Sequence, residues 1–384
     1  MTLVEARWRD ARRAARECAD VLPSESVPVL ELDGRVLAQP LTAQCDLPSF
    51  DSSAMDGWAV CGPAPWLQVG DVRAGTPFDG VLESGQAVRI ATGAVVPRGA
   101  SAVLRWEDAR VEGDRIAGAV SPGADIRRAG EEVRVGERIA EAGTVVTPAL
   151  AGFLAATGHD QVAVIRRPRV RLLLLGDELL TAGIPAGGRI RDSLGPQLPG
   201  WVQRMGAHVV TAVQVVDEIS HVTDAFAAAI ADADAVITTG GTAAGPRDHV
   251  HAAIAALNGE LVIDRVAVRP GHPMLLATVG GVPVIGLPGN PHSAVVGLMT
   301  LGEPVMSGLL GRPRVELVDV RAGDDVRGTP GHTRLVAGRI EDGAFVMAGY
   351  GGSAMLRGLA QATGFAVVDD DVAAGDDVAW LPLP

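Results

Sequence analysis

Three continuous apolar runs in the middle of the chain, residues 169–175, 234–239 and 283–287, predict buried strands. Two segments between them, around residues 219–230 and 250–257, carry apolar side chains at helical spacing. Apolar strands that alternate with amphipathic helices favour βαβ units. They also favour a largely parallel sheet that is buried on both faces.

Each apolar run ends in a turn of small or polar residues. The first ends in Gly176-Asp177-Glu178, the second in Gly240-Gly241-Thr242-Ala243-Ala244-Gly245, and the third in Pro288-Gly289-Asn290-Pro291. Ligands of parallel sheets bind beyond the carboxyl ends of the strands. We therefore expect the three turns to line one crevice, and we expect the chemistry there.

The pattern changes on either side of this central region. Residues 2–18 predict a helix, and residues 141–158 predict a turn followed by a helix that starts at Pro148 and ends at Gly158. From about residue 41 to residue 135, short β-prone pieces alternate with turn clusters, which predicts an all-β insert. After Pro313 short strands and glycine turns return, which predicts a separate C-terminal β domain.

Length and composition narrow the class of protein. A chain of 384 residues, 47% hydrophobic and 21% charged, predicts a globular protein with two to four domains. The net charge is −13, and all 33 cationic residues are arginine. An acidic chain of this kind is a poor candidate for binding nucleic acid or an anionic membrane. Any bound anion must be held locally, by arginine and by backbone N–H groups.

Three widely spaced cysteines, Cys18, Cys45 and Cys61, argue against a zinc site or a disulfide framework. The charged N-terminal residues leave no apolar core for a signal peptide. No run of about 18 apolar residues is present, so we expect no membrane span and a cytoplasmic location.

The turns allow alternative roles. Two carboxylates directly after a buried strand, as in Asp177-Glu178, either bind a divalent cation or cap the following helix. The glycine-rich turn at Gly240 lets backbone N–H groups approach a phosphate, although it is neither a Walker A loop nor a GxGxxG fingerprint. Three such turns at one sheet edge indicate a phosphorylated ligand.

Three polar stretches of the β insert allow two interpretations each. Asp56-Gly57 and Thr92-Gly93 are either simple turns or parts of a site. Arg127-Arg128, followed by Glu131-Glu132, is either a solvated charge run or an anion clamp.

Taken in order, these motifs resemble the molybdopterin molybdenumtransferase family, which comprises the MoeA proteins and the homologous domain of gephyrin. The resemblance covers nearly the whole chain. It rests on residues 53–60, 92–97, 126–132, 142–145, 167–170, 176–179, Asp192-Ser193, Gly240-Gly241 and 286–291.

The resemblance implies an α/β multidomain fold with a central MogA-like α/β sandwich, an N-terminal α+β region, a β-rich insert and a C-terminal β-barrel. The implied division is an N-terminal bent domain of residues 1–44 plus 131–167 and an insert of residues 45–130. The central domain would span residues 168–312 and the barrel residues 313–384.

The resemblance also implies an activity. Molybdenum from molybdate would enter adenylylated molybdopterin with release of AMP, assisted by a divalent cation, usually Mg²⁺. A homodimer would share its active site between the central domain of one chain and the N-terminal region of the other. A MogA-like adenylyltransferase and molybdoenzymes would be its protein partners.

Carried over to this chain, the family pattern assigns two sets of residues. The catalytic set is Asp56, Thr92, Glu178 and Asp248, of which Glu178 and Asp248 would hold the metal. The substrate-binding set is Arg127, Arg128, Asp192, Ser193, Gly240, Gly241, Thr242, Gly245, Arg269, His272, Pro288, Asn290, Pro291 and Arg334.

The chain departs from the family pattern at several positions. The usual Lys-Pro-Gly-Lys-Pro is Arg269-Pro270-Gly271-His272-Pro273, so a histidine, only partly charged near neutral pH, replaces an anion-binding lysine. The expected Ser-Leu-Ala-x-Ala-Asn is residues 358–363, Gly-Leu-Ala-Gln-Ala-Thr. Pro196 and Pro199 are expected to disturb the helix that follows Asp192-Ser193.

Two alternatives to an active insertase follow from these departures. The first is a non-catalytic paralogue that binds molybdopterin, or its adenylylated form, as a carrier or assembly partner. The second keeps only the chemistry of the central domain, an adenylyl transfer to molybdopterin.

Overall fold

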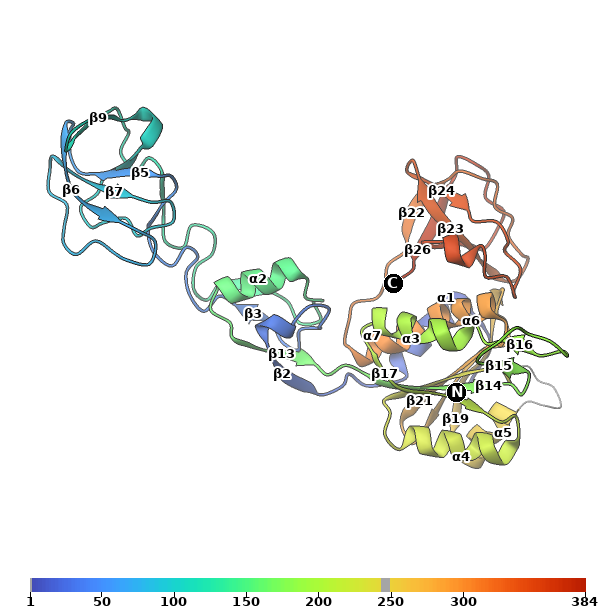
Figure 1. Cartoon of the computed structure of the whole chain (residues 1–384). Coiled ribbons are helices and arrows are strands. Elements are labelled where there is room, and N and C mark those ends of the chain that lie inside the picture. Colours follow the sequence, from blue (N-terminus) through green and yellow to red (C-terminus); the bar gives the residue numbers. More distant parts are fainter. Residues whose placement is uncertain (1, 243–248) are drawn as a thin grey trace.

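The computed structural model describes residues 2–242 and 249–384. Figure 1 shows an elongated chain in which a β-rich insert lobe lies at one end and a small connecting lobe in the middle. A central α/β lobe and a C-terminal β lobe lie together at the other end. Within the described residues, no helix is long and apolar enough to cross a membrane.

The central lobe is built on a sheet with the strand order β17-β14-β18-β21-β20-β19. Its strands are β14 (Arg169–Leu175), β17 (His208–Val215), β18 (Ala235–Thr239), β19 (Glu260–Arg269), β20 (Leu275–Val279) and β21 (Val282–Leu287). The first four in the sheet order are parallel, as predicted. β20 is antiparallel to both of its neighbours, which the sequence reading did not anticipate, because the two-residue turn Gly280-Gly281 joins β20 to β21.

Helices cover both faces of this sheet. They are α1 (Trp8–Glu17), α3 (Leu194–Arg204), α4 (Ile219–Ile230), α5 (His249–Ala256), α6 (Pro291–Gly297), a π-helical turn (Leu298–Gly302) and α7 (Glu303–Leu309). Alternate residues of β14 point to opposite faces, so Leu172 and Leu174 join one apolar core and Leu173 and Leu175 the other. The first core holds α1, α3, α6 and α7, and the second holds α4 and α5. The predicted burial of both sheet faces is confirmed.

Two predictions of local structure in this lobe are wrong. Residues 2–18 are not one helix, because β1 (Leu3–Arg7) pairs in parallel with β19 and α1 begins only at Trp8. This long-range pairing overrides local helix preference. The helix α3 runs through Pro199, because Leu194, Leu198 and Val202 pack one face of it into the core. Pro196 lies in its first turn, where a backbone N–H has no helical partner to lose.

The connecting lobe consists of short strands and one helix. Its elements are β2 (Ser24–Pro28), a 3₁₀ turn (Val29–Glu31), β3 (Leu41–Thr42), β12 (Arg138–Ala140), α2 (Pro148–Ala156) and β13 (Gln161–Ile165). The helix begins at Pro148, as predicted, and the hydroxyl of Thr147 caps it by accepting from Leu150 N at 3.2 Å. β1 and α1 belong to the central lobe, and the division at residues 44, 130, 167 and 312 stays a prediction.

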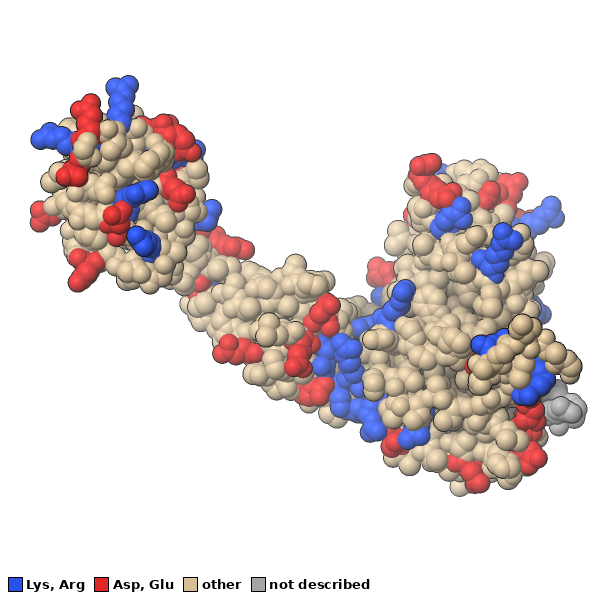
Figure 2. All heavy atoms as spheres, viewed as in Figure 1, with Lys and Arg blue, Asp and Glu red and all other residues tan. Residues whose placement is uncertain are grey.

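The insert lobe is all β among its regular elements, apart from the 3₁₀ turn Trp106–Asp108, as predicted. Its six-stranded sheet has the order β8-β5-β7-β6-β10-β9. The strands of the lobe are β4 (Ser52–Ser53), β5 (Gly57–Val60), β6 (Trp66–Val72), β7 (Gln86–Ile90), β8 (Ala102–Arg105), β9 (Arg110–Glu112), β10 (Arg115–Ala117) and β11 (Ile126–Arg127). Acidic and basic side chains are interspersed over the visible face of this lobe (Figure 2).

The C-terminal lobe is a closed sheet, which confirms the predicted β-barrel. Its elements are β22 (Val318–Ala322), β23 (Thr333–Glu341), β24 (Ala344–Met347), the 3₁₀ turn Leu359–Gln361, β25 (Gly364–Val368) and β26 (Asp377–Pro382). The order β23-β24-β22-β26-β25 closes because β25 also pairs with β23. β23 pairs in parallel with the end of β19 of the central sheet, and Arg269 and Arg334 are register partners there.

An ion pair ties the connecting lobe to the central sheet. The guanidinium of Arg166 donates two hydrogen bonds to Asp234, at 2.7 and 2.8 Å, and Arg169 N donates a third at 2.7 Å. Arginine side chains gather on the visible face at this junction (Figure 2). Burial by itself raises the pKa of Asp234, but the bonds from Arg166 and Arg169 together bring the pKa below its ordinary value.

We expect Asp234→Ala to lower the free energy of unfolding by about 2 kcal/mol at neutral pH, because it removes charge-assisted bonds at a partly buried site. The folded-state pKa of Asp234 lies below the unfolded value, so this stabilisation is present above the unfolded pKa, about 3.9. It is lost as the pH falls through the folded pKa. Urea unfolding of the wild type and the variant at neutral and acid pH measures the difference.

The matched control is Glu141→Ala, which removes an exposed ion pair with Arg138. It is expected to cost no more than about 0.5 kcal/mol. Equal losses for the two variants, or a loss at Asp234 that does not narrow at acid pH, would contradict the assigned role.

Candidate functional site

A crevice lies where β14, β18 and β21 end, and it contains parts of all three predicted turns. Its volume is about 390 Å³. It is lined by Gly176, Glu178, Asp192, Ser193, Asp217, Thr239, Gly240, Gly241, Gly289, Asn290 and Pro291, and by apolar neighbours such as Leu175 and Leu194. The parallel strands bring together turns that lie more than 100 residues apart in the chain, as the strand pattern predicted.

The glycine turn after β18 has a backbone that few other residues would adopt. Gly240 and Gly241 have φ values of +80° and +63°. A Cβ on Gly240 would lie 3.2 Å from Leu175 O, and one on Gly289 would lie 3.7 Å from the Cα of Gly240. The two turns therefore pack against each other and leave backbone, rather than side chains, facing the crevice wall.

Three carboxylates line the crevice. Asp192 Oδ1 accepts from Leu194 N and Gly195 N at 2.9 Å each, so it caps α3. The exposed Glu178 side chain has no hydrogen-bond or ion-pair partner among the described residues. Asp217 Oδ1 is buried without a hydrogen-bond partner among those residues, and His249 Nε2 is 3.9 Å away. Glu178 and Asp217 are therefore the carboxylates that remain available to a ligand.

Asp217 was missed by the sequence analysis. It follows β17, the fourth parallel strand, and so reaches the same sheet edge as the three predicted turns. The strand before Asp217, residues 208–215, mixes apolar and polar residues. It therefore lacks the continuous apolar pattern that identified the other three strands and the turns after them.

A second group of predicted residues lies where the central sheet meets the C-terminal lobe. Arg269 and Arg334 are register partners there, and Arg334 Nη1 donates to Arg327 O at 2.7 Å. The ring of His272 lies 5.8 Å from that of His332, and His272 Nε2 is 2.6 Å from Glu5 Oε2. Glu5, which also contacts Arg265 at 3.2 Å, is a counter-charge that sequence analysis did not identify.

A third group lies in the insert lobe around Asp56. Asp56 Oδ1 accepts from Thr92 N at 2.7 Å and from Thr92 Oγ1 at 3.0 Å, and these bonds lower the pKa of Asp56. Both residues line a cavity of about 710 Å³. Trp106, half exposed, stacks on Trp58 at 4.8 Å and lies 5.0 Å from the Arg89 guanidinium. Trp106 and Arg89 add an aromatic ring and a cation that the sequence analysis did not identify.

The predicted arginine pair of the insert is held in place by an acid. Arg128 Nη1 contacts Asp51 Oδ2 at 2.6 Å, and Ala129 N donates to Asp51 Oδ1 at 2.9 Å. These contacts, the bond from Ala129 first, lower the pKa of Asp51. Arg127 is exposed on β11. Arg128 is therefore part of an ion pair, whereas Arg127 has no ion pair among the described residues.

Comparison with known proteins relates most of the chain to one family. Residues 6–158 match the MoeA N-terminal region (domain I and II), residues 171–308 a probable molybdopterin-binding domain, and residues 319–383 the MoeA C-terminal region (domain IV). A molybdopterin molybdenumtransferase from Nostoc sp. is 33% identical over 388 residues, covering 94% of this chain and 89% of that protein. The chain belongs to the molybdopterin molybdenumtransferase family.

Other relatives cover the chain to a similar extent. Molybdopterin molybdenumtransferase 2 from Mycobacterium tuberculosis is 33% identical over 398 residues, covering 97% of this chain and 96% of that protein. The crystal structure of a molybdopterin biosynthesis MoeA protein from Pyrococcus horikoshii superposes with a TM-score of 0.83 at 24% identity. It covers 98% of this chain and 99% of that chain, which confirms the predicted fold.

The family's predicted site residues fall into three separate groups in this chain. Glu178, Asp192, Ser193, Gly240, Gly241, Asn290 and Pro291 share the crevice. Pro288 adjoins it in sequence, whereas Thr242 is buried and does not line it. Gly245 and Asp248 lie outside the described residues. Asp56 and Thr92 lie in the insert lobe, at the far end of the chain from the crevice (Figure 1).

The crevice also has donors that fit a divalent cation. Among the described residues, no group of three or more histidine, cysteine or acidic side chains is arranged to hold a metal ion. Mg²⁺ in proteins is commonly held by one or two carboxylates, with substrate phosphates and water completing the shell. Asp217 Oδ1, which is buried without a hydrogen-bond partner, and Glu178, which has no partner among the described residues, meet that requirement.

Proposed function

We propose that this protein inserts molybdenum from molybdate into adenylylated molybdopterin, with release of AMP, to give the molybdenum cofactor. The observation that carries this proposal is the crevice at the ends of β14, β18 and β21, in a chain whose full-length relatives are named molybdopterin molybdenumtransferases. The protein is then a transferase, and molybdate and adenylylated molybdopterin are its substrates.

The turns of the crevice are suited to a phosphorylated ligand. Gly240 and Gly241 carry no side chains, so a phosphate can approach their backbone. Asn290 stands at the start of α6 on the facing wall, and its Nδ2 is 3.4 Å from Ser353 Oγ of the C-terminal lobe. We assign the phosphate groups of the pterin substrate to the part of the crevice formed by Gly240, Gly241 and Asn290.

Glu178 and Asp217 are the residues that would hold Mg²⁺, and the family pattern adds Asp248. The bound cation would neutralise negative charge on the phosphates and so favour departure of AMP. The two carboxylates would hold the cation at the end of the sheet, and the Asp192 cap fixes the start of α3 beside them.

We assign molybdate to the group around Arg269, His272 and Arg334. Molybdate is a doubly negative anion, and two arginines on neighbouring strands and a histidine in the turn after β19 offer it donors. Glu5 contacts His272 Nε2 and therefore competes with the anion for that ring.

The separation of Asp56 and Thr92 from the crevice supports a homodimer in which the insert of one chain completes the crevice of the other. In light scattering at micromolar concentration, the protein is expected to have the mass of two chains. We place the reaction in the cytoplasm, because thiols stay reduced there and the three cysteines of the chain are free. A MogA-like adenylyltransferase would supply the substrate and molybdoenzymes would receive the product.

The decisive experiment is single-turnover insertion. The purified protein is given adenylylated molybdopterin, Mg²⁺ and limiting molybdate, and both AMP release and reconstitution of an apo-molybdoenzyme are measured. Parallel AMP release and cofactor formation, each dependent on molybdate, are expected. Tight pterin binding without AMP release would instead favour the non-catalytic carrier. The names of the relatives do not favour that alternative.

A further inference from the structure

A cavity rich in arginine lies beside α1, away from the three groups described above. Its volume is about 420 Å³, and five arginines and two glutamates line it. The arginines are Arg9, Arg12, Arg13 and Arg16 of α1 and Arg314 of the segment that joins α7 to β22, and the glutamates are Glu303 and Glu316. The chain as a whole carries a net charge of −13, so this excess of cations is local.

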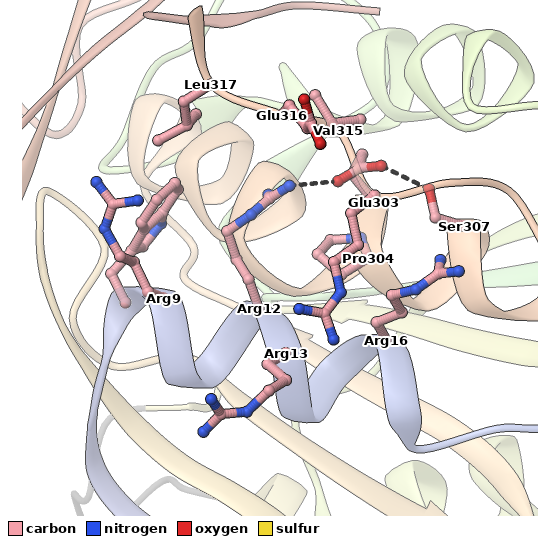
Figure 3. Close-up of a pocket in the computed structure, with 12 residues that line it drawn as sticks. Arg9, Arg12, Arg13, Arg16, Glu303, Pro304, Ser307, Val315, Glu316 and Leu317 are labelled. Atoms are coloured by element: carbon pink, nitrogen blue, oxygen red, sulfur yellow. Dashed lines mark hydrogen bonds and ion pairs between the residues drawn. The ribbon is translucent and has the colours of Figure 1, made fainter. Parts of the chain in front are cut away.

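One arginine of the cavity is fixed by the protein itself. Arg12 Nη2 donates to Glu303 Oε2 at 2.7 Å, and its Nη1 donates to Met299 O. Ser307 Oγ donates to the other oxygen of Glu303 at 2.6 Å (Figure 3). The side chains of Arg12 and Glu303 are only 13% and 8% exposed. Burial lowers the pKa of Arg12, and Glu303 acts against this. Glu303 is thus already engaged. Arg13 and Arg314 pair with Asp10 and Glu17, at 2.8 and 3.1 Å, so Arg9 and Arg16 are the cations of the cavity that have no ion pair among the described residues.

Arg16 is the cation that points to a ligand. It lies one turn after Arg12 on α1, and Figure 3 shows it on the Ser307 side of the cavity. Its Nη1 is buried without a hydrogen-bond partner, and its side chain has no ion pair among the described residues. A buried donor without an acceptor costs free energy, most of all when it is charged. Arg13, by contrast, is directed away and pairs with Asp10 at 2.8 Å.

The remaining walls of the cavity suit the apolar part of an organic ligand. Pro304, Val315 and Leu317 present apolar surface opposite the arginines. A cavity of this size with an apolar wall and a few charged groups is typical of small-molecule sites. The planar fork of donors on arginine matches the oxygens of a phosphate group.

We propose that this cavity binds a phosphate dianion, carried by a small organic ester whose body lies against Pro304 and Leu317. Arg16 and Arg12, one turn apart on α1, face the phosphate. The ligand also contacts residues 314–317, which connect the central lobe to the barrel, so its binding orders that connection. The site is distinct from the crevice and does not depend on the proposed function.

Titration calorimetry of the full chain with ribose 5-phosphate, ribose and inorganic phosphate tests this proposal. Arg16→Gln removes the unpaired charge and breaks no hydrogen bond of the protein, so it is expected to fold with an unchanged or raised melting temperature. It should weaken phosphate-ester binding at least about tenfold. Arg204→Gln, which removes an exposed arginine of α3 outside this cavity, is the matched control and should bind as the wild type does.

The arms of the titration separate the two sources of phosphate. Binding of ribose 5-phosphate that is tighter than that of inorganic phosphate, and absent for ribose, identifies an ester as the ligand. Equal binding of both phosphates, still lost in Arg16→Gln, identifies the free anion as the ligand of the same site. Phosphate binding that Arg16→Gln leaves unchanged belongs to another site, such as the crevice, and overturns the proposal, as does the absence of binding. Slower hydrogen exchange of residues 314–317 on binding is the independent readout.

Discussion

Replacing Glu178 with glutamine is expected to lower molybdenum insertion by at least about a hundredfold, the scale of losing one electrostatic contact to a reacting group. Pterin binding should stay within a few-fold of the wild type, because the amide keeps the shape of the side chain and loses only its charge. Glu178 lines the crevice and has no partner among the described residues, so no hydrogen bond within that part of the chain is lost. Single-turnover AMP release and pterin fluorescence titration measure the two effects separately.

The matched control is Asp177→Asn, which removes the same charge one residue earlier. Asp177 is exposed and does not line the crevice, and within the described part of the chain its side chain accepts only from Asp217 N, at 3.2 Å. It should keep most of the activity. A Glu178→Gln variant that turns over normally would remove Glu178 from the catalytic set. If it lost folding and binding together, its role would be structural.

The parts of the fold that sequence analysis predicted correctly are those with a local signal. Strands β14, β18 and β21 are continuous apolar runs because both faces of a parallel sheet are buried, and each ends in glycine or proline turns that break the run. Pro148 and Gly158 delimit α2 for equally local reasons. The crevice followed from these elements, since parallel strands place their carboxyl ends at one edge.

The parts that were missed depend on contacts between distant residues. β1 exists because residues 3–7 pair with residues 263–267, and this pairing places Glu5 against His272. No window of sequence around Glu5 contains that partner. Asp217 was missed for a different reason, because β17 is an edge strand whose polar residues hide its period. The helix through Pro199 survives because core packing of its apolar face outweighs one lost backbone bond.

A shared active site predicts a specific pattern of activity in hybrid dimers. Asp56→Asn keeps the oxygen that accepts from Thr92 and removes the charge, so we expect this variant to fold and to be inactive on its own. A dimer of one Asp56→Asn chain and one Glu178→Gln chain has one crevice with both groups intact and one with neither. If each crevice is completed by the partner's insert, this hybrid regains about half of the wild-type activity, as C2 symmetry requires.

The reciprocal hybrid is the control, and it reverses the expectation. A wild-type chain paired with a chain that carries both substitutions has one group missing from each shared site, and should be inactive. If each chain instead used its own insert, the wild-type chain would work alone, so this hybrid would keep about half of the activity and the first would have none. Two affinity tags isolate each hybrid, and light scattering confirms its mass. The insert lobe lies far from the crevice of its own chain (Figure 1), so we expect the first outcome.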